Sequence, residues 1–299
     1  MADSPEVLVA ATFPFNKANS DVVLRTCDNV DLRVRKAILS EASVVFEDMW
    51  TLPQPPAQTG PDDGVPVVSV SENERTLHYL LRFCYPMENP NLKTVEDVFA
   101  VMEAARKYMM DHVLIEVKRQ FLHYAEREPL RTYAIACNRG LEEEMRIAAK
   151  ASLLEPLADS HEMEELERIT AGAYLRLSAY HRACRKVASS LGYCGRDKTG
   201  RRVWAAKKDW RDSLVNIEPW WASYMILASE ALKIRPRGTT VLKEEFVHKF
   251  LVDVIGPRDS QYEKNKALSE FAEFSAEFAE AVERIISSIQ LKIPLKITL

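Results

Sequence analysis

The sequence predicts an α/β domain of the α+β type, with a small sheet flanked by helices, followed by an all-α C-terminal domain. Three observations favour this fold class. A strand–turn–strand–helix pattern lies near the N-terminus, a further strand with helices follows it, and the rest of the chain is helical in pattern and poor in glycine. The chain has 299 residues and 9 glycines, so its length favours two domains.

The first strands and the helix after them lie between residues 21 and 49. Residues 22–24 and 32–34 are short β-branched runs, separated by a polar turn at Asp28-Asn29. A two-stranded hairpin is not stable alone, so this segment must begin a larger domain. One helix is predicted to follow, with these apolar positions: Ile38, Leu39, Val45, Phe46 and Met49.

The next segment completes the first domain. Residues 66–70 predict a third strand, and Ser71 with Glu74 has the spacing of a capping box at a helix start. Apolar residues then recur at helical spacing until Tyr85-Pro86 ends the run. Further helices are expected at residues 95–108 and 111–125. A loop rich in Pro, Gly and Asp at residues 52–64 is expected on the surface.

From Glu128 onward the pattern is helical. Helices are expected at residues 129–137, 141–154, 162–191, about 218–235, 242–255 and along the acidic C-terminal stretch. In the last helix, apolar residues from Leu268 to Ile289 follow heptad spacing. Packing on the rest of the helical domain is favoured over a self-associating coiled coil, because three heptads are few. The expected domains are a flexible N-terminus at 1–12, a first domain at 13–125 and a helical domain at 126–299.

Composition and charge limit the classes of partner. The formal net charge of −4 argues against general attraction to nucleic acid or to an anionic membrane. No apolar run approaches the roughly 20 residues of a membrane span, and the N-terminus lacks the pattern of a signal peptide. The five scattered cysteines fit a reducing compartment. We therefore expect a protein of the cytoplasm or the nucleus.

The order of elements, together with particular residues, resembles the BTB/POZ family over about residues 13–125. The matching pieces are residues 21–24 (DVVL), 32–40 (LRVRKAILS), Ser43, Phe46, 77–85 and 104–108 (AARKY). BTB domains usually carry His-Lys or His-Arg where this chain has Arg35-Lys36. The extended match through residues 128–137 is similar to BTB proteins of mushroom-forming fungi.

This resemblance implies a protein-interaction domain that forms a two-fold homodimer. The dimer interface, or seam, would be formed by the N-terminal segment and the first helix. The candidate interface residues are Phe13, Phe15, Ala37, Leu39, Val44, Val45 and Met49. In the family, an acid at the hairpin start and a base at the helix start share a buried charged pocket near the seam. The resemblance places Asp21, Arg35 and Lys36 in that pocket. They are either a docking point for a partner or a salt bridge that fixes the hairpin to the helix.

Val70-Ser71-Glu72 has the hydrophobic–any–Glu form that helps some BTB proteins to bind a cullin scaffold. The motif is short, so Glu72 is better explained as an acid in the first turn of a helix, where the helix dipole favours it. Cullin binding through Val70 and Glu72 is therefore a candidate role beside a structural one.

Two clusters in the helical domain have alternative interpretations. His181, Cys184 and Cys194 have some metal-ligand character, but zinc prefers four ligands and no fourth is near, so buried thiols and a surface histidine are expected. A basic block between residues 182 and 211, interleaved with Trp204 and Trp210, fits nucleic-acid or acidic-peptide binding. Pairing of this block with acidic helix surfaces, such as residues 142–144 and 162–167, is favoured because the chain is acidic overall.

No catalytic motif, cofactor site or phosphate-binding loop is visible in the sequence. We therefore expect a non-enzymatic protein without a cofactor or a bound metal. Three functions remain open: a homodimeric scaffold that recruits a protein partner through its helical domain, a substrate adaptor of a cullin-type ubiquitin ligase, and a transcriptional regulator that acts through a partner.

Overall fold

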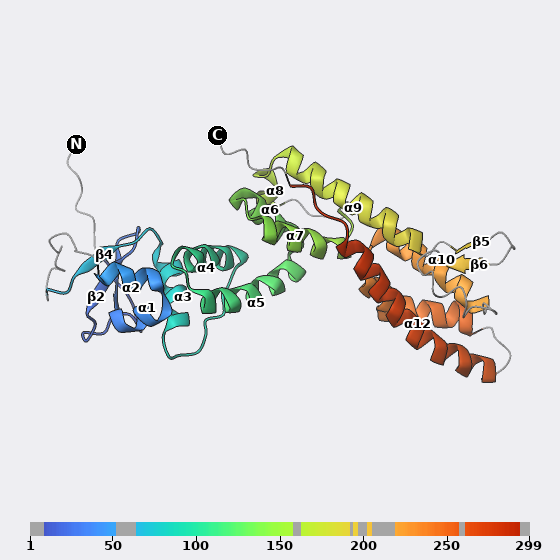
Figure 1. Ribbon diagram of the computed structural model, residues 1–299, viewed down its shortest axis with the longest axis horizontal. Helices are drawn as coiled ribbons and strands as arrows, with labels where there is room; N and C mark the ends of the chain where they lie inside the picture. Colours follow the sequence, from blue (N-terminus) through green and yellow to red (C-terminus); the bar gives the residue numbers. More distant parts are fainter. Residues whose placement is uncertain are drawn as a thin grey trace. The chain divides into compact units, whose positions relative to one another are not determined.

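The computed structural model of the chain describes residues 9–51, 64–157, 163–191, 194–196, 202–204, 219–256 and 261–293. The chain divides into two compact units, Met1–Tyr124 and Ala125–Leu299. The first combines a small sheet with helices, and the second is mainly helical (Figure 1). The predicted fold class is confirmed. The expected flexible segment at 1–12 and the expected surface loop at 52–64 lie mostly outside the described residues.

A four-stranded sheet in the order β1-β3-β2-β4 forms the centre of the first unit. The predicted hairpin is present: β2 (Val22–Arg25) runs antiparallel to β3 (Val30–Val34), with Val23 opposite Arg33. β4 (Val67–Ser69) is the predicted third strand and runs parallel to β2. β1 (Val9–Ala10) is parallel to β3 and lies within the segment expected to be flexible, where no strand was predicted.

The turn of the hairpin is closed by local polar contacts. Asn29 has a φ of 60°, in the left-handed region that asparagine tolerates. The Thr26 hydroxyl accepts a 2.9 Å hydrogen bond from the Val30 amide. Arg25 donates to both carboxylate oxygens of Asp31 at 2.7 and 2.9 Å, in a bidentate pair across the strands. These contacts fix the register at the end of the hairpin.

The predicted helix after the hairpin is wrong in one respect, because it is two helices. α1 (Lys36–Ala42) and α2 (Val44–Thr51) are separated by Ser43, whose backbone is extended at φ −155° and ψ 119°. The Ser43 hydroxyl accepts a hydrogen bond from the Phe46 amide and donates one to the Tyr108 carbonyl. Serine thus caps α2, and its second bond ties this corner to the end of a distant helix.

The predicted capping box of the next helix is also wrong. α3 (Glu74–Cys84) begins after Asn73, whose side chain accepts from the Thr76 amide at 2.9 Å. Asp28, in the hairpin turn, accepts from the Glu74 amide at 2.9 Å. Ser71 lies too early to cap the helix, because Asn73, an equally good capping residue, is closer to the start of the apolar pattern.

The remaining helices of the first unit match their predictions to within two residues. α4 (Val95–Lys107) starts with a capping box formed by Thr94 and Asp97, and α5 (Asp111–Arg127) follows. α3 lies between the sheet and α4 (Figure 1). The core is mainly apolar, and its largest fully buried side chains are Phe15, Leu24, Leu32, Leu39, Phe46, Phe99, Tyr108 and Phe121.

The first part of the helical unit contains a helical pair. α6 (Pro129–Arg139) begins with Pro129 and ends at Gly140, whose φ is 66°, and α7 (Glu142–Ala151) and the 3₁₀ turn η1 (Ser152–Leu154) continue from it. The predicted long helix over residues 162–191 is wrong, because it is divided into α8 (Glu164–Glu167) and α9 (Ala171–Leu191). Thr170 lies at the division and its hydroxyl accepts from the Ala173 amide, as a capping residue does.

The second part of the helical unit has a short hairpin and further helices. β5 (Cys194–Arg196) and β6 (Arg202–Trp204) form a two-stranded hairpin that the sequence did not predict. α10 (Pro219–Ile234) follows the predicted start at residues 218–221. The predicted helix over 242–255 is only partly α-helical. It consists of α11 (Glu244–Phe250) and the π turn η5 (Leu251–Ile255), and the 3₁₀ turn η4 (Gly238–Leu242) precedes it.

The C-terminal helix, α12 (Gln261–Ser287), packs on the rest of its own unit. Its buried positions among the described side chains are Phe271, Phe274, Ser275, Phe278, Ala279, Val282 and Ile286. Tyr224 of α10 lies at the centre of an aromatic cluster and makes edge-on ring contacts with Phe246, Phe250, Phe271, Phe274 and Phe278. Of the heptad-like positions, Phe271, Ser275, Phe278 and Val282 are buried within this unit, as the favoured interpretation predicted, whereas Leu268 is 40 % exposed and Ile285 and Ile289 are half-buried.

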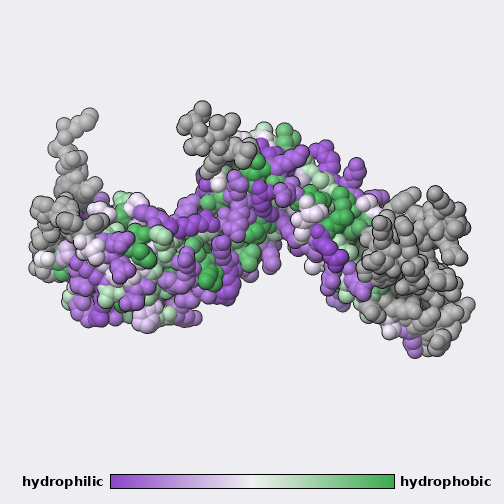
Figure 2. Space-filling model, in the orientation of Figure 1, coloured by the Kyte–Doolittle hydropathy of each residue, from purple (hydrophilic) through white to green (hydrophobic). Residues whose placement is uncertain are grey.

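None of the helices in the described part of the chain is long and apolar enough to cross a membrane. The surface of Figure 2 carries mixed hydrophilic and hydrophobic side chains, with hydrophobic surface showing over the helical unit.

Candidate protein-interaction surface

The hairpin, the N-terminal segment and the start of α1 meet at one corner of the first unit. Phe15 is fully buried and its ring makes edge-on contacts with His78 and Tyr85 of the α3 region, at centroid distances of 5.2 and 5.3 Å. The Tyr85 hydroxyl accepts from the Arg35 amide at 2.9 Å. The segment that contains Phe13 is thus anchored beside the helix that begins at Lys36.

The acid at the hairpin start holds the helix through its backbone. Oδ1 of Asp21 accepts a 2.8 Å hydrogen bond from the Lys36 amide. Asp21 and Arg35 are exposed, and the ammonium of Lys36 lies 5.5 Å from the centre of the Trp50 ring. The arrangement therefore differs from the expected buried ion pair: Asp21 satisfies an orphan amide of the first turn, and Lys36 makes a cation–π contact.

The seven residues proposed for the dimer interface divide into three groups by exposure. Phe15 and Leu39 are fully buried in the core of the unit, so they offer no surface to a second chain. Phe13 and Val44 are 73 % and 56 % exposed, which is high for large apolar side chains. Ala37 is exposed, and Val45 and Met49 are half-buried. The apolar surface of this region therefore consists of Phe13 and the outer sides of α1 and α2.

Glu72, the candidate cullin contact, is occupied inside the unit. Its side chain is 8 % exposed, and its carboxylate accepts from the Lys107 ammonium at 2.8 Å and from the Tyr108 hydroxyl at 2.7 Å. Burial by itself would raise the pKa of Glu72, but the hydrogen bonds from Lys107 and Tyr108 outweigh it, and the net pKa lies below the usual 4.5. The carboxylate joins the start of α3 to the end of α4.

Val70, the other residue of that motif, continues the sheet. Its amide donates to the Arg25 carbonyl at 2.8 Å, and its side chain is half-buried. Sequence reasoning did not connect Lys107 and Tyr108 with Glu72, because 35 and 36 residues separate them and no local period links them. Residues 104–108 were among those that resemble the BTB/POZ family, but the resemblance did not indicate which residues they contact.

In the helical unit, the expectation of a surface histidine is wrong. His181 is 2 % exposed, and its Nε2 lies 2.8 Å from the hydroxyl of Ser152, which is equally buried. Burial and the nearby Arg185 lower the pKa of His181 to about 4. Cys184 is buried as a free thiol, as expected. The side chain of Cys194 lies outside the described residues.

The basic block is described only at its start, because most of residues 197–218 lie outside the described part. The acidic helix surfaces have other partners there: Glu142 pairs with Arg146, Glu164 with Arg168, and Glu165 with Arg131. The expected pairing between the block and these helices is not seen for these acids. Across the described residues, no group of three potential His, Cys, Asp or Glu metal ligands comes together.

Comparison with protein families assigns the first unit. Residues 13–124 match the family model of the BTB/POZ domain. The small sheet, the hairpin and the helices around it fit this match, and the chain therefore carries a BTB/POZ domain, which is generally a protein–protein interaction module. No curated protein matches the chain. The likeness to BTB proteins of mushroom-forming fungi stays a prediction.

Proposed function

We propose that the chain is a non-enzymatic scaffold that forms a homodimer through its BTB/POZ domain and recruits a protein partner through its helical unit. The observation that supports the dimer is the exposure of Phe13 and Val44, at 73 % and 56 %, in a domain built for protein contact. Water gains freedom when such surface is buried, and a two-fold seam buries each residue twice.

The seam would extend from Phe13 across α1 and α2. Ala37 is exposed on α1, and Val45 and Met49 retain part of their surface on α2. Lys36 and Asp21 lie at the start of α1, where they can form a polar rim to the apolar patch. A stable homodimer of this kind buries on the order of 2,000 Å² in total.

Co-purification of two differently tagged full-length copies tests the dimer. Wild-type copies should co-purify, and the double variant Phe13→Asp, Val44→Asp should lose most of the partner copy, because two charges would be buried on each side. Ile115→Asp is the matched control, since Ile115 of α5 is 68 % exposed in the same unit. If Ile115→Asp disrupts pairing and the double variant does not, the proposed seam is wrong.

The cullin-adaptor and transcriptional-regulator functions have less support. The Glu72 carboxylate is engaged by Lys107 and Tyr108, so a cullin contact would have to use other atoms of this corner. A Glu72→Lys change would disturb the domain itself and could not separate cullin binding from folding. Ser69→Arg, at an exposed position of β4 beside this corner, is the better probe of cullin capture.

A further inference from the structure

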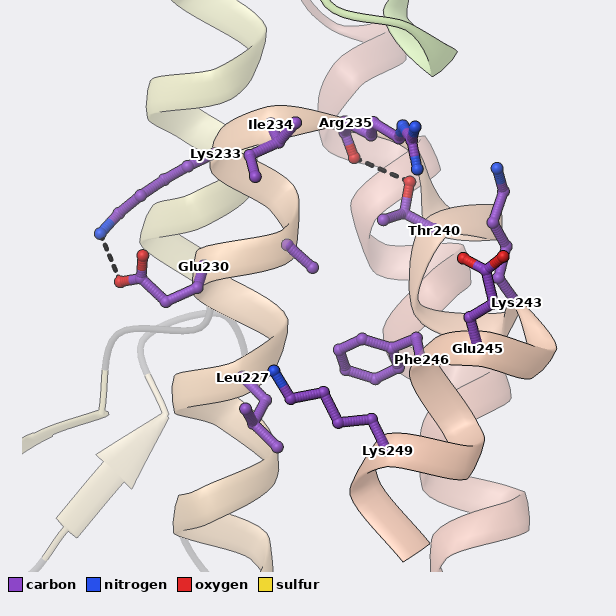
Figure 3. Close-up of a pocket in the computed structure, with 11 residues that line it drawn as sticks. Leu227, Glu230, Lys233, Ile234, Arg235, Thr240, Lys243, Glu245, Phe246 and Lys249 are labelled. Carbon is purple, nitrogen blue, oxygen red and sulfur yellow. Dashed lines mark hydrogen bonds and ion pairs between the residues drawn. The ribbon is translucent and has the colours of Figure 1, made fainter. Parts of the chain in front are cut away.

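A pocket opens between α10 and the segment formed by η4 and α11 in the helical unit. Its volume is about 420 Å³, within the range of pockets that hold small ligands or peptide side chains. The apolar part of its lining comes from Leu227, Ala231, Ile234 and Phe246. Figure 3 shows Leu227 and Phe246 facing each other from opposite walls. The pocket can therefore accept at least one large apolar side chain.

Basic side chains dominate the rim. Four of the lining residues are basic (Lys233, Arg235, Lys243 and Lys249) and two are acidic (Glu230 and Glu245). Lys233 pairs with Glu230 at 2.6 Å, on α10 itself. Lys243 and Lys249 form no ion pair with any carboxylate in the described part of the chain. Among the residues that the structure describes, these two cations beside an apolar surface therefore have no carboxylate partner.

Arg235 is a further basic residue of the pocket with a polar atom that has no partner. Its Nε is buried and has no hydrogen-bond partner among the described residues. The Arg235 carbonyl is satisfied, because it accepts from the Thr240 hydroxyl at 2.8 Å. The Nε itself is closed off from solvent, so an external ligand would meet the other guanidinium nitrogens of this pocket-lining side chain, for which a carboxylate is a suitable acceptor.

Helix dipoles explain only some of these charges. Lys233 lies in the last turn of α10, where a cation is favoured, whereas α11 continues directly into η5, so Lys249 does not lie at a free helix end. Lys243 is the residue before α11, at the end where the dipole disfavours a cation. Its place on the rim is therefore better explained by a ligand than by the helix.

The cations lie at different ends of the pocket. Figure 3 shows Lys249 reaching toward Leu227, and Lys243 lying near Arg235 and Thr240 on the other side of Phe246. A fatty acid or another ligand with one anionic group would use one end. A peptide with acidic residues on both sides of an apolar residue would use both ends and the apolar lining between them.

We propose that this pocket binds an acidic segment of a partner protein, in which one large apolar side chain is flanked by carboxylates. The inference deepens the proposed function, since it names the chemistry of the partner that the helical unit recruits. The apolar side chain contacts Leu227 and Phe246, and the carboxylates pair with Lys249 at one end and with Lys243 and Arg235 at the other.

Arrays of short synthetic peptides test the proposal with the full-length chain. Each peptide of the first array has a central Leu, Phe or Trp between Asp or Glu residues, in a Gly/Ser background. Two matched arrays replace the acids by Asn or Gln, or the apolar residue by Ser. Peptides of the first array should bind with a Kd well below about 1 mM, and those of the matched arrays at least about tenfold more weakly.

Charge reversal then locates the site. Lys243→Glu with Lys249→Glu should weaken binding of the acidic peptides by about tenfold or more, since both side chains are exposed and their replacement leaves the core intact. Lys186→Glu is the control, an exposed lysine of α9 in the same unit. Circular dichroism checks that each variant is folded. Equal binding by all arrays, no binding by the first array, or equal loss in the control would overturn the proposal.

Self-association of the same variants separates this proposal from the proposed dimer. The double reversal lies in the helical unit, so it should leave co-purification of two tagged copies unchanged. A chain that fails to dimerise but binds the acidic peptides through Lys243 and Lys249 would refute the dimer and support the pocket.

Discussion

The Tyr108 hydroxyl donates a 2.7 Å hydrogen bond to Oε2 of Glu72, which brings the end of α4 to the loop before α3. Lys107 donates to the same carboxylate at 2.8 and 3.1 Å. Tyr108 also stacks on Phe46 of α2, with ring centroids 4.6 Å apart. Glu72, which the sequence made a candidate for partner binding, therefore stabilises the inside of the BTB/POZ domain.

Replacement of Glu72 should destabilise the first unit. Glu72→Ala leaves the buried Tyr108 hydroxyl without its acceptor, and we expect a loss of about 1–3 kcal/mol in the free energy of unfolding. Glu41→Ala, at an exposed position of α1, should change it by less than about 0.5 kcal/mol. Urea unfolding of the full chain measures both. A loss no larger than that of the control would mean that the Glu72 contacts contribute little.

Elements whose sequence signals lie within a few residues of one another could be predicted, and elements that depend on distant contacts could not. The hairpin, α4 and α6 are specified by β-branched runs, a capping residue or Pro129, all within a few residues. The division of α1 from α2 depends on Ser43, whose hydroxyl reaches the Tyr108 carbonyl 65 residues away. Helical periodicity continues through such a position, so the break could not be predicted from it.

The candidate surface was predictable in the same limited way. The resemblance located Phe13 and Val44, which are exposed, but it also included Phe15 and Leu39, which are buried. Apolar character alone does not distinguish a seam from a core. The pocket beside Phe246 was missed because its basic residues come from α10, η4 and α11, which are adjacent only after folding.

Acid should destabilise the helical unit through His181. The pKa of His181 is about 4 in the folded chain, against 6.5 ordinarily, so the unfolded chain binds more protons between these values. The neutral His181 therefore contributes about 3 kcal/mol to the free energy of unfolding. This contribution is fully present above pH 6.5 and is lost as the pH falls toward 4.

His181→Gln provides the comparison, since glutamine can still bond to Ser152 but does not titrate. Chemical denaturation at several pH values within this window should show a steeper fall in stability for the wild-type chain than for the variant. Parallel curves would show that His181 is not the titrating group.

Gly238 should tolerate no side chain. A Cβ atom at Gly238 would lie 2.3 Å from the Ala279 carbonyl oxygen of α12, and the Gly238 amide donates to Glu283 at 2.9 Å. Gly238→Ala is therefore expected to cost about 1–3 kcal/mol or more, because backbone on two elements must move apart.

Gly172→Ala is the matched control for Gly238→Ala. Its Cβ would meet only the flexible ends of Arg176 and Thr170, at 3.2 and 3.8 Å, and alanine is the better helix former in α9. Thermal unfolding should show a lower Tm for the first variant and an unchanged or higher Tm for the second. A lower Tm for both in equal measure would remove the close approach as the cause.

Tyr224 should respond in opposite directions to two substitutions. Its ring is fully buried at the centre of the aromatic cluster, but its hydroxyl has no hydrogen-bond partner among the described residues. Tyr224→Phe keeps the ring contacts and removes the unmet hydroxyl, so stability should be unchanged or rise by about 1 kcal/mol. Tyr224→Ala leaves a cavity and should cost about 3–5 kcal/mol. A large loss in the phenylalanine variant would reveal a partner for the hydroxyl.

Sedimentation equilibrium of the full-length chain at micromolar concentration tests the central claim most directly. The chain mass is 34.1 kDa. We expect about twice that mass for the wild type, and 34.1 kDa for the Phe13→Asp, Val44→Asp variant with unchanged circular dichroism. A wild-type mass of 34.1 kDa throughout this range would contradict the proposed homodimer.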